Sequence, residues 1–457
     1  MSGVRNTRGM NRRSFLAIAG LSTLGAAALS ACGGTGGSGG ETTQAFDQPD
    51  GQVPDQYKDR LRVVMWSTYT DHNGEVLAGL AKAFNDSQSD IYVEIQVQRT
   101  YDETAQKVAA GLQARQVPDL TVFSEVSWHR FFLNDTLEPL DDYFGDGFEK
   151  DVYIDQLRSE GELAGATWWL PFARSTPLFY YNRTLFEHVG LPDRAPETWS
   201  ELRSWGPALA GATFNGNAPK LHVYPQIDGD WQFQGVLWNF GGGISDGLDV
   251  ILDSDESIAA GEFERALVHD DGMAYMTKEI STDFANGLVA TVETSTGSLR
   301  GILETATFDV GTGFVPKELE PGLTTGGGGL AIMKGAAKER KEAAFEFIKF
   351  LAQPENSATW TVETGYMPAT KAAVDQPALA TLMQENPNFG VAVEQLPTTR
   401  VADDVRLFVP NANVQVYEGL QKIWADNQRP EDVFVTVAEE LRRATEEIRA
   451  DYESRMG

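Results

Sequence analysis

The chain has 457 residues, with 66 acidic and 37 basic side chains, which gives a formal net charge of −29 at pH 7. This excess of acid argues against nucleic acid as a partner, because phosphates would repel the protein, and against a polybasic membrane contact. Beyond its N-terminal segment the chain exceeds the roughly 250–300 residues at which one core stops growing, so we expect two lobes.

The first 31 residues are typical of an export signal. Arg12 and Arg13 form a twin-arginine arrangement, and an apolar, alanine-rich stretch follows them. The stretch ends in Leu29-Ser30-Ala31-Cys32, which is similar to a bacterial lipobox. We therefore predict that residues 1–31 are a twin-arginine lipoprotein signal and that Cys32 is the lipidated first residue of the mature protein.

Residues 32–57 are predicted to be a lipid-anchored flexible tether, because glycine and serine dominate their first part. Cys32 is the only cysteine in the chain, so the exported protein has to fold without internal disulfides. No other segment has the ~20 apolar residues that a membrane helix needs. The expected location is the outer face of the cytoplasmic membrane, reached through the lipid on Cys32 alone.

Residues 61–123 have the pattern βαβαβ. A short apolar run at 61–66 predicts a strand, helical spacing follows at 76–84, and strict alternation at 91–97 predicts a second strand. A helix at 104–115 and a strand at 120–123 complete the pattern, which favours a parallel sheet. Ligands of such sheets bind beyond the carboxyl ends of the strands, which here lie near Thr68, Tyr101 and Glu125.

Two features stand out in the middle of the chain. Thr198 is a candidate N-cap of a helix, and Glu201 would complete a capping box with it. Trp231 follows Asp228-Gly229-Asp230, which we interpret as a polar turn, where a purely structural tryptophan is harder to explain.

The last third of the chain predicts one strand and two long helices. The strand is expected at 330–333, and an amphipathic helix at 339–351. The last helix is expected at about 432–454, with a core stripe made of Val433, Val435, Val437 and Leu441.

The enzyme motifs that match do so only formally. The patterns G-x-S-x-G and G-x-G-x-x-G both fall in the glycine-rich tether, without the strand and helix that each motif needs. The five histidines are scattered, no C-x-x-C is present, and the acidic runs lack EF-hand spacing. We therefore expect no enzyme activity, no cofactor and no metal site.

The segment 171–182, Pro-Phe-Ala-Arg-Ser-Thr-Pro-Leu-Phe-Tyr-Tyr-Asn, resembles the middle of family 1 extracellular solute-binding proteins of ABC importers. Within that family it is most similar to the Ugp-type binders of glycerol 3-phosphate and glycerophosphocholine. Further pieces agree, at 101–103, 295–299, 326–330, 364–368 and 406–407. The resemblance extends from about residue 60 to the C-terminus.

The resemblance implies an α/β, two-lobed periplasmic-binding-protein-like fold with three hinge crossovers, near Arg174, Thr325 and Gly365. The expected first lobe comprises residues 58–173 and 325–364, and the second comprises 174–324 and 365–457. It also implies capture of a small phosphate-bearing solute for ABC permease subunits, by a protein that we expect to be a monomer and not an enzyme.

The resemblance also implies the binding residues. Tyr101 and Glu125 resemble the groups that bind glycerol hydroxyls. Trp199 and Trp231 resemble the flanking aromatic residues, and Trp231 with a nearby aspartate is a candidate for a quaternary ammonium. The phosphate and backbone contacts correspond to Ser175, Ser295 or Ser298, Gly326 or Gly327, Tyr366 and Arg406.

Other interpretations stay open from the sequence alone. Aromatic, hydroxyl and carboxyl groups also make sugar sites, so an oligosaccharide binder of the maltose or trehalose type is the alternative within the same class. A lipid-anchored phosphodiesterase would need a metal cluster or an activated nucleophile, which the sequence does not offer. A surface adhesin or scaffold would have no small solute.

Overall fold

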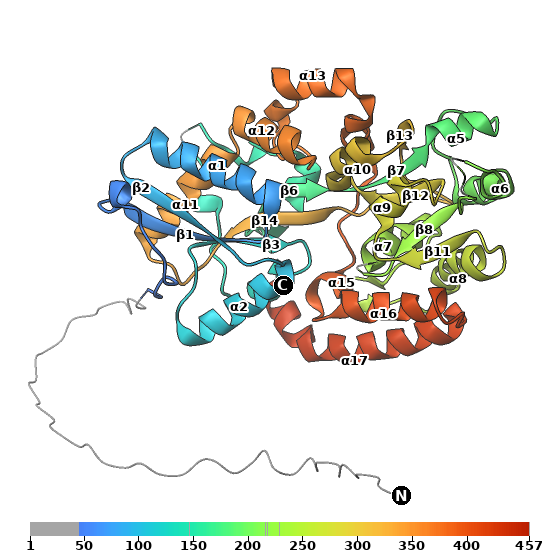
Figure 1. Cartoon of the computed structure of the whole chain (residues 1–457). Helices are drawn as coiled ribbons and strands as arrows, with labels where there is room; N and C mark the ends of the chain where they lie inside the picture. The colour runs from blue at the N-terminus through green and yellow to red at the C-terminus, as the bar shows by residue number, and fades with distance from the viewer. Residues whose placement is uncertain (1–44, 146, 215, 217, 228, 457) are drawn as a thin grey trace, which may run out of the picture. The chain divides into compact units, whose positions relative to one another are not determined.

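Two groups of strands divide the fold into two lobes (Figure 1). The computed structural model describes residues 45–456 except 146, 215, 217 and 228, so the predicted signal and Cys32 lie outside the described residues. The chain first passes between the groups at Thr176, where β6 (Leu170–Ser175) is followed by β7 (Pro177–Asn182). It returns between β13 (Val310–Gly313) and β14 (Gly326–Ile332), and passes a third time beyond residue 364.

The first lobe is built on a five-stranded sheet in the order β2-β1-β3-β14-β6. Its other elements are β1 (Leu61–Ser67), α1 (Asp71–Ser87), β2 (Ile91–Val97), α2 (Tyr101–Ala114), β3 (Leu120–Ser124), α3 (Trp128–Leu133), α4 (Asp155–Ser159), β4 (Glu162–Leu163), β5 (Ala166–Thr167), α11 (Lys338–Leu351) and α12 (Pro354–Thr364).

The register of this sheet confirms the predicted βαβαβ unit but corrects the prediction that the whole sheet is parallel. β1 runs parallel to β2 and β3, so the carboxyl ends of these strands meet at one edge of the sheet. β14 is antiparallel to both β3 and β6, so the sheet is mixed and not wholly parallel. Because β14 runs the other way, its first residues lie at that same edge, with Gly328 opposite Ser124.

Helices cover both faces of the first-lobe sheet, as Figure 1 shows for α1 and α11 on one side and α2 on the other. One face buries a core with residues from α1, α11 and α12, among them Phe84, Phe347 and Trp360. The other face packs on α2 and α3 through Val108, Trp128 and their neighbours. Buried apolar side chains on both faces explain why the strands are rich in branched and aromatic residues.

The second lobe has shorter strands and more helices. In its sheet β7 lies between β12 and β13, and a parallel pair, β8 and β11, lies beside β12, where Thr291 N donates to Leu221 O at 3.0 Å. Its elements are α5 (Arg183–His188), α6 (Trp199–Ala210), β8 (His222–Pro225), α7 (Gly229–Asn239), β9 (Ser245–Asp246), β10 (Asp249–Val250), α8 (Asp255–His269), β11 (Ala274–Thr277), α9 (Ile280–Ala285), β12 (Thr291–Ser295) and α10 (Leu299–Thr305). After the third passage come α13 (Pro377–Glu385), α14 (Val391–Gln395), α15 (Asp404–Phe408), α16 (Ala412–Trp424) and α17 (Pro430–Met456).

Two local predictions are adjusted by the structure. The Thr198 side chain caps α6 as expected, accepting from Glu201 N at 2.9 Å, but Glu201 reaches back to the backbone N of Glu197 and not to that of Thr198. The residues around Trp231 belong to the first turn of helix α7, so the predicted polar turn is wrong.

The last helix, α17, contacts both lobes. Val433, Val437 and Leu441 are buried in the second-lobe core, whereas Val435 is 43% exposed and does not belong to the predicted stripe. Further along, Tyr452 and Met456 pack against the first-lobe core around α3. Figure 1 shows α17 running beside α16.

Candidate functional site

Most of the predicted site residues, but not Trp199 or Ser298, gather at the edge where the carboxyl ends of β1 and β3 meet the start of β14. The glycines at this start allow the close approach. A methyl group on Gly326 would meet the Trp231 indole at 2.7 Å, and one on Gly328 would meet the hydroxyls of Tyr69 and Tyr101 at 2.8 Å. Gly327 has φ +90°, which favours glycine. The glycine run therefore brings aromatic residues of both lobes against one strand.

Three tyrosines converge at this edge. The hydroxyls of Tyr69 and Tyr101 lie 3.1 Å apart, and the Tyr69 and Tyr366 rings meet edge to face at 6.0 Å. Tyr101 is the first residue of α2, which Thr100 caps by accepting from Glu103 N at 3.0 Å. Burial raises the pKa of all three phenols, so they stay protonated and can donate hydrogen bonds.

Arg406 joins the two lobes through carboxylates. It lies on α15 and is 4% exposed, and its Nε donates to Asp230 Oδ2 at 2.9 Å. Its Nη1 lies 3.6 Å from Glu125 Oε1, an ion pair longer than a hydrogen bond. Burial raises the pKa of Asp230, and the Arg406 charge opposes that rise. A first-lobe carboxylate and a second-lobe carboxylate thus share one guanidinium.

A second buried arginine lies at the first passage between the lobes. Arg174, on β6 beside Ser175, has no exposed surface, and its Nη2 donates to Glu160. Its guanidinium carbon stands 4.9 Å from the centre of the Trp169 ring. We call Tyr69, Tyr101, Glu125, Glu160, Arg174, Asp230, Trp231, Tyr366 and Arg406 the junction cluster.

The predicted serines differ in their placement. Ser175 is buried and pairs with Gly326 across the sheet, which puts it beside the Trp231 contact. Ser295 ends β12 and accepts from Gly297 N at 3.1 Å, and a methyl group on Gly297 would lie 3.8 Å from the Tyr366 ring. Ser298 lies at the start of α10, and no contact places it with the junction cluster. Of the two alternatives, Ser295 is therefore the better candidate.

The prediction for Trp199 is wrong. Its ring is 2% exposed in the second-lobe core, beside Phe179 and His222, and its Nε1 donates to Asn239 Oδ1 at 3.1 Å. As the first residue of α6, it faces inward because that face of the helix packs on the core. Trp231, by contrast, is half-buried, and its Nε1 donates to Thr325 O at 2.9 Å at the second passage.

Sequence reasoning missed several members of the cluster. Tyr69 follows β1 directly, so the rule that ligands bind at strand carboxyl ends could have found it. Glu160 and Arg174 carried no local signal of their pairing. Asp230, one of the aspartates near Trp231, is paired with Arg406 and so is not free to meet a cationic ligand.

The described residues offer neither a metal site nor a membrane span. In residues 45–456, apart from the four omitted positions, no group of three or more His, Cys, Asp or Glu side chains could hold a metal ion. The same part of the chain contains no helix that is both long and apolar enough to cross a membrane.

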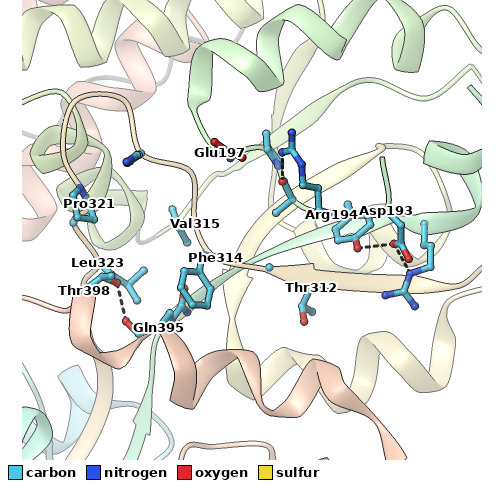
Figure 2. Close-up of a pocket in the computed structure, with 17 residues that line it drawn as sticks. Asp193, Arg194, Glu197, Thr312, Phe314, Val315, Pro321, Leu323, Gln395 and Thr398 are labelled. Carbon is cyan, nitrogen blue, oxygen red and sulfur yellow. Dashed lines mark hydrogen bonds and ion pairs between the residues drawn. The ribbon is translucent and has the colours of Figure 1, made fainter. Parts of the chain in front are cut away.

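A pocket of about 650 Å³ lies elsewhere, in the second lobe (Figure 2). One side of it is charged, with Asp193 and Arg194, and the other is mixed, with Phe314 and Leu323 beside Gln395 and Thr398. Its arginines already have partners, since Arg183 donates to Asp193 and Arg194 forms two bonds with Glu201. None of the predicted site residues lines it, so we place the candidate site at the junction cluster.

Comparison with known proteins identifies the family. Residues 79–391 match the model of the bacterial extracellular solute-binding proteins. The chain belongs to that family. This solute-binding protein is therefore the substrate-binding component of an ABC importer and not an enzyme, and the predicted two-lobed fold is confirmed.

Individual relatives give finer comparisons. UgpB of Mycobacterium tuberculosis, whose crystal structure is a complex with glycerophosphocholine, shares 36% identity with a TM-score of 0.79, covering 84% of this chain and 98% of that one. The sn-glycerol-3-phosphate-binding periplasmic protein UgpB of Escherichia coli K12 is 26% identical over 82% of this chain and 91% of its own. The cyclic α-maltosyl-1,6-maltose binding protein of Arthrobacter globiformis, at 21% identity over 84% of this chain and 99% of its own with a TM-score of 0.72, shares the fold alone.

Proposed function

We propose that this solute-binding protein captures a glycerophosphodiester of the glycerophosphocholine type, or sn-glycerol 3-phosphate. The observation that carries the proposal is the junction cluster, which offers phenol donors, a carboxylate and a half-buried tryptophan at one point between the lobes. Phenol and carboxylate groups suit the vicinal hydroxyls of a glycerol moiety. The 36% identity to a protein that binds glycerophosphocholine supports the same class of ligand.

The charges of the cluster favour the diester over the monoester. Two guanidinium groups, of Arg174 and Arg406, stand among three carboxyl groups, those of Glu125, Glu160 and Asp230. With all of them ionised the cluster carries one excess negative charge. A zwitterion with one phosphodiester and one quaternary ammonium adds no net charge, whereas a dianionic monoester adds two negative charges to a buried acidic site.

Trp231 is the proposed contact for the cationic head group. Its indole face can attract a quaternary ammonium by roughly 0.5–2 kcal/mol. Asp230 is hydrogen-bonded to Arg406 and so is not available to the head group. The attraction for the ammonium therefore comes from the indole ring and from the net negative charge of the cluster. Tyr101, Glu125, Ser175, Ser295, Gly326, Gly327, Tyr366 and Arg406 are proposed to contact the rest of the solute.

Calorimetric titration of the purified protein tests the proposal. We expect tight binding of glycerophosphocholine, weaker binding of sn-glycerol 3-phosphate and no heat from maltose or trehalose. Binding heat with a disaccharide, and none with either phosphate ligand, would instead indicate an oligosaccharide-binding protein.

We further propose that the protein is a monomer anchored outside the cell through a lipid on Cys32. The support for the anchor is the sequence of the first 57 residues, of which 1–44 lie outside the described part of the chain. Mass spectrometry of the protein from its native membrane should detect a diacylglycerol-modified Cys32. A Cys32→Ser variant should appear in the soluble fraction, and its retention in the membrane would contradict the anchor.

A further inference from the structure

Arg174 has more hydrogen-bonding capacity than its surroundings use. It is fully buried, yet only its Nη2 donates, to Glu160, while Nε and Nη1 have no hydrogen-bond partner among the described residues. The Trp169 ring covers one face of the guanidinium but accepts no conventional hydrogen bond. A permanently charged group with two unused donors is costly to bury, so a ligand or water is expected to complete it.

The position of Arg174 puts these donors at the junction cluster. Its backbone pairs with Gly327, and its carbonyl accepts from Met367 N at 2.8 Å, next to Tyr366. Its positive charge acts on the hydroxyls of Tyr69, Tyr101 and Tyr366, opposing the rise that burial gives to their pKa. Arg174 therefore lies within electrostatic range of the donors that are proposed to meet the solute.

Arg406 is a poorer candidate for binding an anion. Its Nη1 also has no hydrogen-bond partner among the described residues, but it faces two carboxylates, Asp230 at 2.9 Å and Glu125 at 3.6 Å, so its charge is more than compensated before any ligand arrives. Arg174 faces one carboxylate, which leaves the pair neutral and two nitrogens unused. The two arginines thus differ in role although both are buried at the junction.

We propose that Arg174 is the specificity residue that makes the site accept an anionic solute, its unused nitrogens serving the phosphate, while Arg406 orients Glu125 and Asp230. The inference rests on the proposed function and adds a residue to it. Glu160 then weakens the attraction between Arg174 and an anionic solute, because its carboxylate neutralises part of the Arg174 charge. Removing the Glu160 charge should therefore strengthen anion binding. If the Glu160–Arg174 pair were purely structural, breaking it would leave the affinity for the solute unchanged or lower.

The test is titration of four variants with glycerophosphocholine. Arg174→Gln in a Glu160→Gln background, which leaves no unpaired buried charge, should weaken binding by about tenfold or more, the size of a charge-assisted hydrogen bond. Arg174→Lys, which keeps the charge, should stay within about fivefold of the natural protein. Glu160→Gln alone should bind several times more tightly. Arg158→Gln is the matched control, since Arg158 also pairs with carboxylates, Asp155 and Glu162, outside the cluster.

The outcomes separate the two proposals. If the natural protein binds neither phosphate ligand, the proposed function fails. If it binds but the double variant binds equally well, the role of Arg174 is overturned and the function stands. Should the double variant not fold, Glu160→Gln alone decides, because unchanged or reduced affinity there contradicts the proposal.

Discussion

The two lobes handle buried carboxyl groups in opposite ways. In the first lobe, Asp119 lies 2.9 Å from Arg340 Nε and Glu160 pairs with Arg174, so each buried acid has a cation. In the second-lobe interior, Glu264 and Glu293 are buried without an ion pair among the described residues, and Glu264 accepts only from Trp424 Nε1 at 3.0 Å. The first lobe therefore pairs its buried carboxylates with cations, whereas burial in the second lobe raises the pKa of Glu264 and Glu293 and so favours their protonated forms.

Substitution of Arg406, which pairs with one carboxylate from each lobe, should have the largest effect on binding and stability. Arg406→Ala leaves the buried Asp230 and the partly buried Glu125 without their cation, and breaking the buried pair with Asp230 costs about 3–5 kcal/mol. We expect glycerophosphocholine binding to fall more than 100-fold and the unfolding temperature to drop. Arg400→Ala, which removes an exposed pair with Glu320, is the matched control and should change neither quantity. An Arg406→Ala variant of natural stability would show that the junction carboxyls need no partner.

The unpaired acids of the second lobe should make its stability depend on pH. Burial raises the pKa of Glu293 to about 8, against an ordinary value of 4.5. The folded state therefore binds a proton that the unfolded state has lost, and the free energy of unfolding falls between about pH 4.5 and 8 by up to ~1.4 kcal/mol per pH unit.

Glu293→Gln should reduce this slope, leaving the part due to Glu264, whose pKa burial also raises, and should increase stability at pH 8. Denaturant titrations at pH 5 and pH 8 would measure it, with Glu262→Gln as the control, since Glu262 is a partly exposed residue of the same lobe that pairs with Arg265. If the free energy of unfolding depended equally on pH in the natural and Glu293→Gln proteins, the pKa of Glu293 would not be raised, and the contrast between the lobes would be wrong.

Trp231 tests the cationic end of the site. Trp231→Ala should weaken glycerophosphocholine binding by roughly 2- to 30-fold, the range of a cation–π contact. Binding of sn-glycerol 3-phosphate, which has no ammonium group, should change less. Equal losses for the two ligands in calorimetry would assign Trp231 a packing role against Gly326. Trp205→Ala, in the same lobe but away from the junction cluster, serves as the control.

Tyr101 should give the smallest effect. Tyr101→Phe removes a hydroxyl that lies 3.1 Å from that of Tyr69 and keeps the ring. Loss of one neutral hydrogen bond corresponds to about 0.5–1.5 kcal/mol, or roughly a 2- to 13-fold weaker affinity. A 100-fold loss would place Tyr101 among the charged contacts, as the phenol would then be holding Glu125 or the anion itself.

The sequence predicts the local structure well and the pairing across lobes poorly. Alternation at 91–97 and the Thr198 cap are local signals, and both correspond to real elements. The antiparallel direction of β14 and the bond from Arg406 to Asp230 depend on residues far apart in the chain, so no local pattern contains them. Trp199 and Trp231 both lie in the first turn of a helix, and the sequence does not reveal which of the two side chains turns into the core.

Helix α17 has a mechanical consequence. At 1.5 Å per residue, its 27 residues form a rod about 40 Å long. One part is embedded in the second lobe through Val437 and Leu441, and the far end is fastened to the first lobe through Arg455, which lies 3.1 Å from Asp135. A stiff strut attached at both ends limits how far two bodies can swing apart. The geometry with which this protein meets its permease is therefore set partly by a helix that contributes no side chain to the junction cluster.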